Sequence, residues 1–301
     1  MAEAVGVSEA AQRRVQWRAS VPFILANLLP LAAIWTGVTW KAVVVGVAFY
    51  AVRVFSITAG YHRYFAHRTF RVGRVTQFLL AFGGTASAQK GPLWWAANHR
   101  VHHRYTDTER DPHTPREGFW WSHVGWVMSG LHKDVDYDDI SEFSKYPELR
   151  FLDRHDWIGP WTLGVLSFLI AGWPGLVVGF FGSTVVLWHS TFFVNSAAHV
   201  WGRRRYDTPD TSRNNWWVAL LTFGEGWHNN HHHYPMSARQ GHRWWEIDVT
   251  YYVLRALALV GIVKDLREPP AKALESRRIS KRGPAARAAE VPPAKERVGV
   301  S

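Results

Sequence analysis

The sequence contains no cysteine among its 301 residues. Disulfides and thiolate metal sites are therefore excluded, and a bound metal would need nitrogen or oxygen ligands. Acidic residues are also scarce, with 24 Asp and Glu against 35 Lys and Arg, which gives a formal net charge of +11. A basic chain favours either nucleic acid or an anionic lipid surface as its partner. Because the basic residues flank apolar segments, we expect membrane lipid and no nucleic acid.

What the chain does have is long apolar runs and many aromatic residues, including 18 tryptophans. The runs cover about 19–37, 42–60, 158–173 and 175–198, and each is apolar enough for a membrane span. Short connections join the first two and the last two, the second connection carrying the turn signal Gly-Trp-Pro-Gly. We predict an all-α integral membrane protein with four transmembrane helices in two hairpins. Arg53, the one charge in the second span, is interpreted as an interfacial anchor, as are the tryptophan pairs at 94–95, 120–121, 216–217 and 244–245.

Most Lys and Arg residues fall outside these runs, in residues 1–18, 61–157 and everything after 198. The positive-inside rule places these segments, and both termini, on the cytoplasmic side, where 61–157 and 199–263 would form a helical cap. Within the cap, glycines interrupt the apolar stretch 75–97, which favours short interfacial or buried helices. Residues 1–18 lack the layout of a cleaved signal peptide. The membrane domain thus covers 19–263, and 264–301 is predicted to be a basic disordered tail.

Sixteen histidines are present, and most fall in short groups. Nine of these histidines follow the second or fourth predicted span or lie in the cap. Within a group they are spaced three, four or five residues apart, except for the adjacent pairs 102/103 and 231/232. They are His62, His67, His99, His102, His103, His199, His228, His231 and His232. Residues three and four apart share one helix face, so each His-x2-His-His group can present its imidazoles together. Nine imidazoles exceed one tetrahedral zinc site and suit two metal ions.

The pair His62 and His67 requires a local distortion, because five residues on an α-helix correspond to about 140° of rotation. We expect the helix to fray near residues 64–66. Nearby carboxylates at Asp107, Asp111 and Glu225 could orient imidazole N–H groups. Imidazole suits iron, zinc, copper and nickel alike, so ligand type alone does not choose the metal. Six of the other histidines are expected to support the ligands, lie at the surface or hydrogen-bond in the core rather than to bind metal. They are His113, His123, His155, His189, His233 and His242.

Five motifs carry a resemblance to a known family: HRYFAH at 62–67, GPLWWAANHRVHHRYTDTERDPH at 91–113, GFWWSHVGW at 118–126, NSAAHVWG at 195–202 and GEGWHNNHHHYP at 224–235. In this order and spacing, over roughly residues 20–260, they resemble the membrane fatty acyl desaturases of the acyl-CoA Δ9 (stearoyl-CoA) type. The resemblance implies a centre of two iron ions held by the nine histidines, with Asn195 binding one metal through water. It also implies that Gln89, Trp95 and Trp188 line the substrate channel.

The implied reaction removes two hydrogens from adjacent methylenes of a saturated acyl chain, with O2 as co-substrate and two electrons, and leaves a cis double bond, by resemblance at Δ9. The implied substrate is a fatty acyl thioester, acyl-CoA foremost. Animal members carry Arg-Asp just before the second histidine box, where this chain has Ala97 and Asn98, so acyl carrier protein and phospholipid acyl chains remain alternatives. The chain lacks the His-Pro-Gly-Gly haem motif, so a separate ferredoxin, cytochrome or flavin reductase is expected to supply electrons.

Two other functions remain open. A fatty acyl or alkane hydroxylase would use the same di-iron site and differ only in whether oxygen is transferred to the carbon. A membrane metal-binding or transport protein would need ionisable residues inside its spans. Here the spans hold only Arg53 and His189, which argues against transport.

Overall fold

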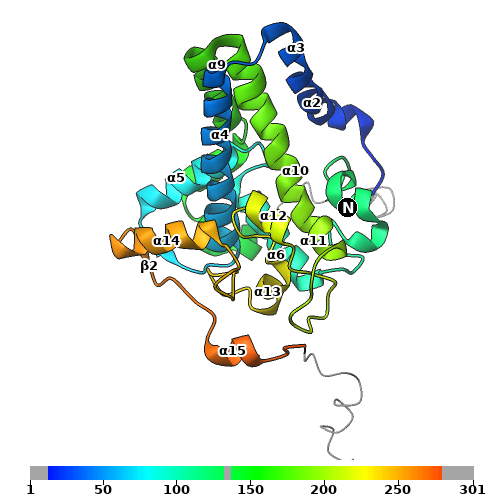
Figure 1. Ribbon diagram of the computed structural model, residues 1–301, viewed down its shortest axis with the longest axis vertical. Helices are drawn as coiled ribbons and strands as arrows, with labels where there is room; N and C mark the ends of the chain where they lie inside the picture. Colours follow the sequence, from blue (N-terminus) through cyan, green and yellow to red (C-terminus); the bar gives the residue numbers. More distant parts are fainter. Residues whose placement is uncertain (1–12, 132–136, 280–301) are drawn as a thin grey trace, which may run out of the picture.

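The computed structural model describes residues 13–131 and 137–279, and these are mostly helical (Figure 1). Within this part of the chain the one sheet has two short antiparallel strands, β1 (Arg71–Val72) and β2 (Val263–Lys264), with Arg71 opposite Lys264. The helices α4 (Trp40–Phe55), α9 (Ile158–Pro174) and α10 (Ser183–Asn195) run along the long axis. Shorter helices, among them α6 (Pro92–Tyr105), α12 (Trp216–Leu221) and α13 (His228–His233), gather around one end.

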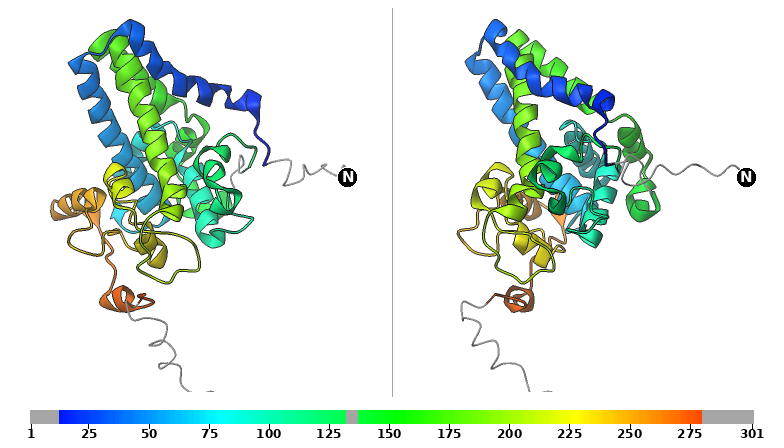
Figure 2. Two further views of the ribbon diagram at one scale, coloured as in Figure 1. Left: turned by 45° about the vertical axis from the view of Figure 1, so that its right-hand side comes forward. Right: turned by 90° about the vertical axis from the view of Figure 1, so that its right-hand side faces the viewer.

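Three helical stretches are long and apolar enough to cross a membrane, namely 17–36, 40–66 and 158–200. The first contains α2 (Trp17–Leu28), η1 (Leu29–Ala32) and α3 (Ala33–Thr36), and it diverges from α4 toward its N-terminal end (Figure 2). It stops at Gly37, whose φ of +74° favours glycine. Thr39 then caps α4, its hydroxyl accepting a hydrogen bond from the Ala42 N–H at 3.2 Å. The first two predicted spans are thus a helical hairpin.

The third stretch turns back on itself. At Ala171 and Gly172 the backbone leaves the helical region, with Gly172 at φ +63°. Beyond this point η6 (Gly175–Gly182) packs against α9, so that Gly164 lies against Phe180. An unbroken helix would separate those two residues by about 24 Å. The predicted turn near residue 172 therefore exists, and the chain continues through α10 into α11 (Ala197–Val200).

Arg53 is not the interfacial anchor that the sequence suggested. It is fully buried between α4 and α10, where its guanidinium donates hydrogen bonds of 2.6 Å to the hydroxyls of Ser183 and Thr184. The residue cannot extend to a membrane surface from this position. Hydroxyl groups on the neighbouring helix, which no pattern in the sequence connects to residue 53, satisfy the charge instead.

The sequence suggested that the second apolar helix frays near residue 64, but it does not. It continues past its predicted end as the π-helix η2 (Ser56–Ala66), and the His67 N–H donates to the His62 carbonyl at 3.1 Å. A π-helix bonds residues five apart, so residues with this spacing stack along one face. The ring centroids of His62 and His67 are 4.8 Å apart. Winding, not fraying, brings the two imidazoles together.

Residues 75–97 form the short helices that were predicted. α5 (Arg74–Thr85) packs on η2, and α6 begins at Pro92 after an extended turn. The carboxylate of Asp153, from α8 (Pro147–Arg154), accepts hydrogen bonds from the N–H groups of Leu93 and Trp94. A carboxylate at a helix N-terminus is favourable, and this one fixes the helix that carries three of the histidines. Other elements connect these helices. They are η3 (Pro115–Glu117), η4 (Trp121–Gly125), η5 (Tyr137–Ile140), α7 (Ser141–Ser144) and α14 (Val249–Leu259).

Part of the predicted disordered tail is ordered. Within 264–279 the chain forms β2, the short helix α15 (Ala271–Glu275) and a bridge in which Arg278 pairs with Tyr206. The Ala273 carbonyl lies 2.6 Å from His233 Nε2. Pairing through the main chain needs no apolar periodicity, which is why the sequence pattern did not indicate it. Residues 280–301, like 1–12, lie outside the described residues.

Candidate metal centre

The nine predicted histidines separate into two groups. His62, His67, His99, His103 and His231 form the first, and His102, His199, His228 and His232 form the second. Within each group the nearest ring nitrogens lie within 4.8 Å of one another. Each group therefore has the size of one metal coordination sphere.

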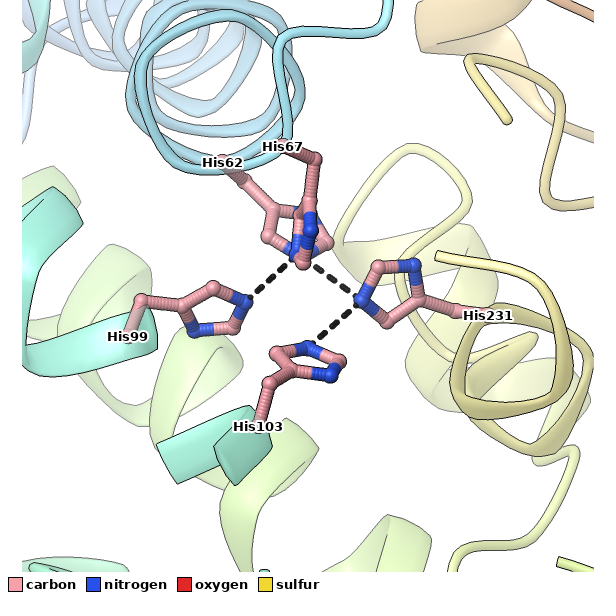
Figure 3. A group of neighbouring side chains, drawn as sticks. All are labelled: His62, His67, His99, His103 and His231. Carbon is pink, nitrogen blue, oxygen red and sulfur yellow. Dashed lines mark hydrogen bonds between the residues drawn. The ribbon is translucent and has the colours of Figure 1, made fainter. Parts of the chain in front are cut away.

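The first group, the five-histidine group, is assembled from three elements (Figure 3). His62 lies near the end of η2, and His67 is the first residue after that helix. α6 supplies His99 and His103, and α13 supplies His231. On α6 the spacing of four places His99 and His103 on one face, one turn apart. His102 lies on another part of the helix surface and belongs to the second group. One helix thus serves both groups.

The second group, the four-histidine group, combines α6, α11 and α13. His199 and His228 approach with their Nε2 atoms 3.0 Å apart. His113 lies beside this group, with its ring centroid 4.3 Å from that of His102, and it shares the carboxylate of Asp111. His102, Asp111 and His113 could themselves hold a metal ion, so the expectation that His113 does not bind metal stays a prediction.

Four of the nine imidazoles contact a carboxylate through Nδ1. The pairs are His62–Glu225 at 2.5 Å, His102–Asp111 at 3.0 Å, His199–Asp107 at 3.4 Å and His232–Asp210 at 2.9 Å. A carboxylate that accepts the Nδ1 proton leaves the Nε2 lone pair free and fixes the ring orientation. Three of these carboxylates were anticipated from the sequence. Asp210 was not, because it lies in a polar loop 22 residues before His232.

The carboxylates are held in their ionised form. Burial alone would raise the pKa of Glu225, but His62 and Arg63 lower it to about 2. For Asp111, burial is likewise outweighed by His102 and His113, and its pKa lies well below the usual range. Gln240, also missed from the sequence, donates at 2.7 Å to Glu225 Oε2, the same oxygen that His62 contacts. These partners keep the negative charges in place behind the imidazoles.

Several of the nine imidazoles are strongly favoured in the neutral form that binds metal. Burial, followed by the neighbouring rings, lowers the pKa of His99, His103, His228 and His231 well below the ordinary value. A metal ligand must be the unprotonated nitrogen. At these four positions the surroundings therefore favour lone pairs over cations, whereas Asp111 outweighs burial and raises the pKa of His102.

The donor set fits a cation. His231 Nε2 lies 3.1 Å from His62 Nε2 and 2.9 Å from His103 Nε2. A neutral imidazole carries one proton, and His62 directs its Nδ1 toward Glu225, so the Nε2 lone pair of His62 points into this cluster of ring nitrogens. In the four-histidine group the Nε2 atom of His232 is buried without a hydrogen-bond partner. Crowded and orphaned nitrogens of this kind are stabilised when a metal ion occupies their centre.

A cavity of about 80 Å³ adjoins both groups, with His62, His99, His102 and His228 among its lining residues. It shares five residues with a larger cavity of about 640 Å³. The shared residues are Gln89, Trp94, Trp95, Trp126 and Phe192. The two cavities therefore adjoin each other. Together we call them the channel, which runs from the histidines toward α2 and the start of α9 and has a largely aromatic lining.

The other predicted site residues lie along this channel. Asn195, at the end of α10, lines the inner cavity with the histidines. Trp95 stacks on His99 with ring centroids 5.0 Å apart, and Gln89 donates to the Thr191 hydroxyl at 3.1 Å. Trp188 lines the outer cavity, where it stacks on Phe23 and its indole N–H donates to the Ser87 carbonyl. Trp94 and Trp95 thus line the channel instead of anchoring the protein at an interface.

Apolar helices joined to two buried, nitrogen-rich groups define a membrane-associated, metal-binding helical protein. The comparisons with known proteins then give the particular family. Residues 38–261 match the family model described as fatty acid desaturase. The chain belongs to the fatty acid desaturase family, which confirms the resemblance drawn from its motifs.

Individual relatives differ in the acyl carrier that their names state. The chain is 41% identical over 244 residues to the sn-1 stearoyl-lipid 9-desaturase of Synechocystis sp., an alignment that covers 79% of this chain and 76% of the relative. It is 36% identical over 267 residues to the sn-1 stearoyl-lipid 9-desaturase of Anabaena variabilis, covering 87% and 97%. It is also 39% identical over 235 residues to the acyl-CoA C20 Delta5-desaturase of Anemone leveillei, covering 77% and 75%.

Proposed function

We propose that this protein is an O2-dependent fatty acyl desaturase that forms a cis double bond, at Δ9, in a saturated acyl chain. The observation that carries the proposal is the pair of histidine groups at the inner end of an aromatic-lined channel. An apolar chain in this channel would place its methylenes beside both groups. Family membership and the relatives named as 9-desaturases support the reaction and its position.

The nine histidines are the proposed ligands of two iron ions, five for one and four for the other, with Asn195 binding the second through water. When bound, the irons would supply the oxidising chemistry toward an unactivated C–H bond that no side chain provides. The protein's own residues orient the ligands and the substrate, and they exclude water. Carboxylates fix the imidazoles, while Trp95 and Gln89 hold the acyl chain and keep bulk water out of the channel.

For the membrane arrangement we propose four spans in two hairpins, with the bend at Gly172 separating the third from the fourth. Both termini and the histidine groups would lie on the cytoplasmic side. The distribution of Lys and Arg supports this orientation, and the bare hairpin turns would then lie on the opposite side. Localisation is therefore proposed as an integral, multi-pass protein of the cytoplasmic membrane in a bacterial host.

The outer cavity supports a membrane lipid as the acyl carrier. Among the described residues that line it, Lys90 is the one cation, and Asp156 pairs with it at 3.5 Å. Coenzyme A carries several phosphate charges, which are normally bound by clustered Arg and Lys. Trp157 and Trp161 on the same cavity are more than half exposed, as suits the interface of a bilayer. Acyl-CoA, the carrier expected from the sequence, is the second candidate because a relative is named for it.

The overall reaction needs two electrons from outside the acyl chain. We propose a separate redox protein, such as a ferredoxin, a cytochrome or a flavin reductase, as their source. The sequence contains no His-Pro-Gly-Gly haem motif, and it has no cysteine, the usual ligand of iron–sulfur clusters.

Expression in a host without its own desaturase tests the proposal. We expect monounsaturated fatty acid to accumulate, with the double bond at carbon 9 by mass spectrometry of derivatised methyl esters, and about two irons per purified chain. Pulse labelling and separation of lipid classes would show whether new double bonds appear first in glycerolipid or in acyl-CoA.

Two variants examine the two histidine groups separately. His102→Ala and His231→Ala should each abolish the product while the protein still inserts into the membrane, and each should lower the iron content. His155→Ala, outside both groups, serves as the control and should retain product. A hydroxylated product, no product from the wild type, or stoichiometric zinc in place of iron would contradict the proposed function.

A further inference from the structure

A further cavity lies beside the histidine centre and apart from the acyl channel. This basic groove has a volume of about 1610 Å³. Its charged and aromatic lining consists of Arg203, Arg204, Arg205, Arg243, Arg278, Glu246, Trp201, Trp216, Trp217, Trp227 and Trp245. None of these residues lines the channel proposed for the acyl chain. The groove is thus separate from the cavities proposed for the acyl chain and needs its own explanation.

The groove carries a net positive charge. Glu246, its one carboxylate, is buried and paired with Arg205. Among the described residues, no carboxylate forms an ion pair with Arg203, Arg204, Arg243 or Arg278. Residues 280–301 contain five Lys and Arg and two Glu, so this part of the chain is itself basic and not complementary to the groove. An acidic partner is the complement that the charge requires.

The floor of the groove is next to both histidine groups. Trp227 is 8% exposed there and immediately precedes His228 of the four-histidine group. Asn214, also in the groove, donates through its side chain to Asn230 Oδ1 at 2.7 Å, and Asn230 immediately precedes His231 of the five-histidine group. The groove lining therefore directly adjoins a proposed ligand of one metal, His228, and is separated from a ligand of the other, His231, by Asn230 alone.

The metal centre can be approached from two sides, through the aromatic channel and from the basic groove. The aromatic channel would be filled by the acyl chain during the reaction, so electrons must arrive from another side. Because electron transfer slows steeply with distance, a carrier needs a surface close to the metals. The basic groove meets this requirement at Trp227 and Asn214, and its volume and open wall suit a protein surface rather than a small ligand.

We propose that the basic groove docks a small acidic electron-carrier protein that reduces the centre through the Trp227–His228 side. The proposal rests on the proposed function. One turnover converts –CH2–CH2– with O2, two electrons and two protons into –CH=CH– and two waters. Two reduced one-electron carriers are each oxidised by one electron per turnover, and they dock in succession.

Binding of an oxidised, acidic plant-type [2Fe–2S] ferredoxin to the purified full-length protein tests the docking. Binding does not require turnover. The double variant Arg203→Glu/Arg243→Glu should weaken the Kd about tenfold or more at low salt, and wild-type binding should weaken as salt rises. The matched control Arg150→Glu/Arg154→Glu changes the net charge equally on exposed arginines of α8 that have no ion pair within the described residues. Its affinity should equal that of the wild type.

Three results would overturn the proposal: equal ferredoxin affinity in all three proteins, an equal loss of affinity in both double variants, or no binding to the wild type. A groove variant that loses binding of short-chain phosphatidylglycerol but keeps ferredoxin would instead make the groove a lipid site. The iron content and melting temperature of the groove variant should match the wild type, because its side chains lie outside the histidine groups. Double-bond formation by the wild type with a chemical reductant is measured separately, so failure of the desaturase function and failure of docking give different results.

Discussion

At the scale of single residues, the centre depends on how each imidazole is held as much as on which residues are histidine. His62, the first of the nine, shows this: Glu225 fixes its Nδ1, and Gln240 and Arg63 in turn hold the carboxylate. A ring without such a partner can rotate and present the wrong nitrogen. The pairing of His232 with Asp210 provides the simplest test, because Asp210 contacts no other histidine of the nine.

Asp210→Asn should weaken metal retention about 10-fold to 100-fold, the usual consequence of removing a carboxylate behind a histidine ligand. The amide keeps the shape of the side chain but loses the charge that orients the ring. Competition with a chelator, followed by the metal content, measures the effect. Asp207→Asn is the matched control, since Asp207 is exposed in the same loop. Equal retention in the two variants would show that Asp210 does not support the site.

At the scale of elements, departures from regular α-helix shape the site. The π-winding of η2 brings His62 and His67 onto one face, and the break at Ala171 and Gly172 folds the third apolar stretch back on itself. Gly179 lets α4 approach η6 closely, since a Cβ on Gly179 would lie 3.2 Å from the Val45 side chain and 3.3 Å from the Ala42 carbonyl oxygen. Small residues at such contacts are typical of helix pairs in membranes.

Gly172→Ala should lower the stability by about 1–2 kcal/mol, because an L-residue is strained at positive φ. Gly182→Ala is the control. Gly182 has negative φ, and an added Cβ would approach nothing closer than 3.6 Å. Thermal unfolding of both variants in the same detergent provides the comparison. A Gly172 variant as stable as the control would show that the bend tolerates a side chain and does not depend on the left-handed conformation.

At the scale of the molecule, the histidine groups join segments far apart in the chain. The five-histidine group connects η2, α6 and α13, and the four-histidine group connects α6, α11 and α13. A metal ion in each group would act as a cross-link between these elements. Such an ion binds only the folded chain, so binding adds to the free energy of unfolding.

Removal of metal with a chelator should therefore lower the melting temperature, and two equivalents of Fe2+ should restore it. Metal at 100 times its Kd contributes about 2.7 kcal/mol per site. Differential scanning fluorimetry in detergent measures the change, and Mg2+, which prefers oxygen ligands, should not restore it. An apoprotein that melts at the temperature of the metal-loaded protein would mean that the groups do not join the elements through metal.

The sequence by itself determined the features that depend on local pattern. Apolar runs predicted the long helices, the Gly-Trp-Pro-Gly segment predicted the bend, and repeated histidine spacings predicted the residues that converge. These signals are readable because helix formation and burial depend on residues close together in the chain.

Only the tertiary structure decided how the nine histidines divide, since His102 and His103 are neighbours in sequence but belong to different groups. It also placed Asp210 behind His232, buried Arg53 against Ser183 and Thr184, and ordered residues 264–279 against the loop at 205–207. Each of these depends on contacts between distant segments, whose geometry no local spacing encodes. The basic groove arises in the same way, from arginines 75 positions apart that folding gathers beside the centre.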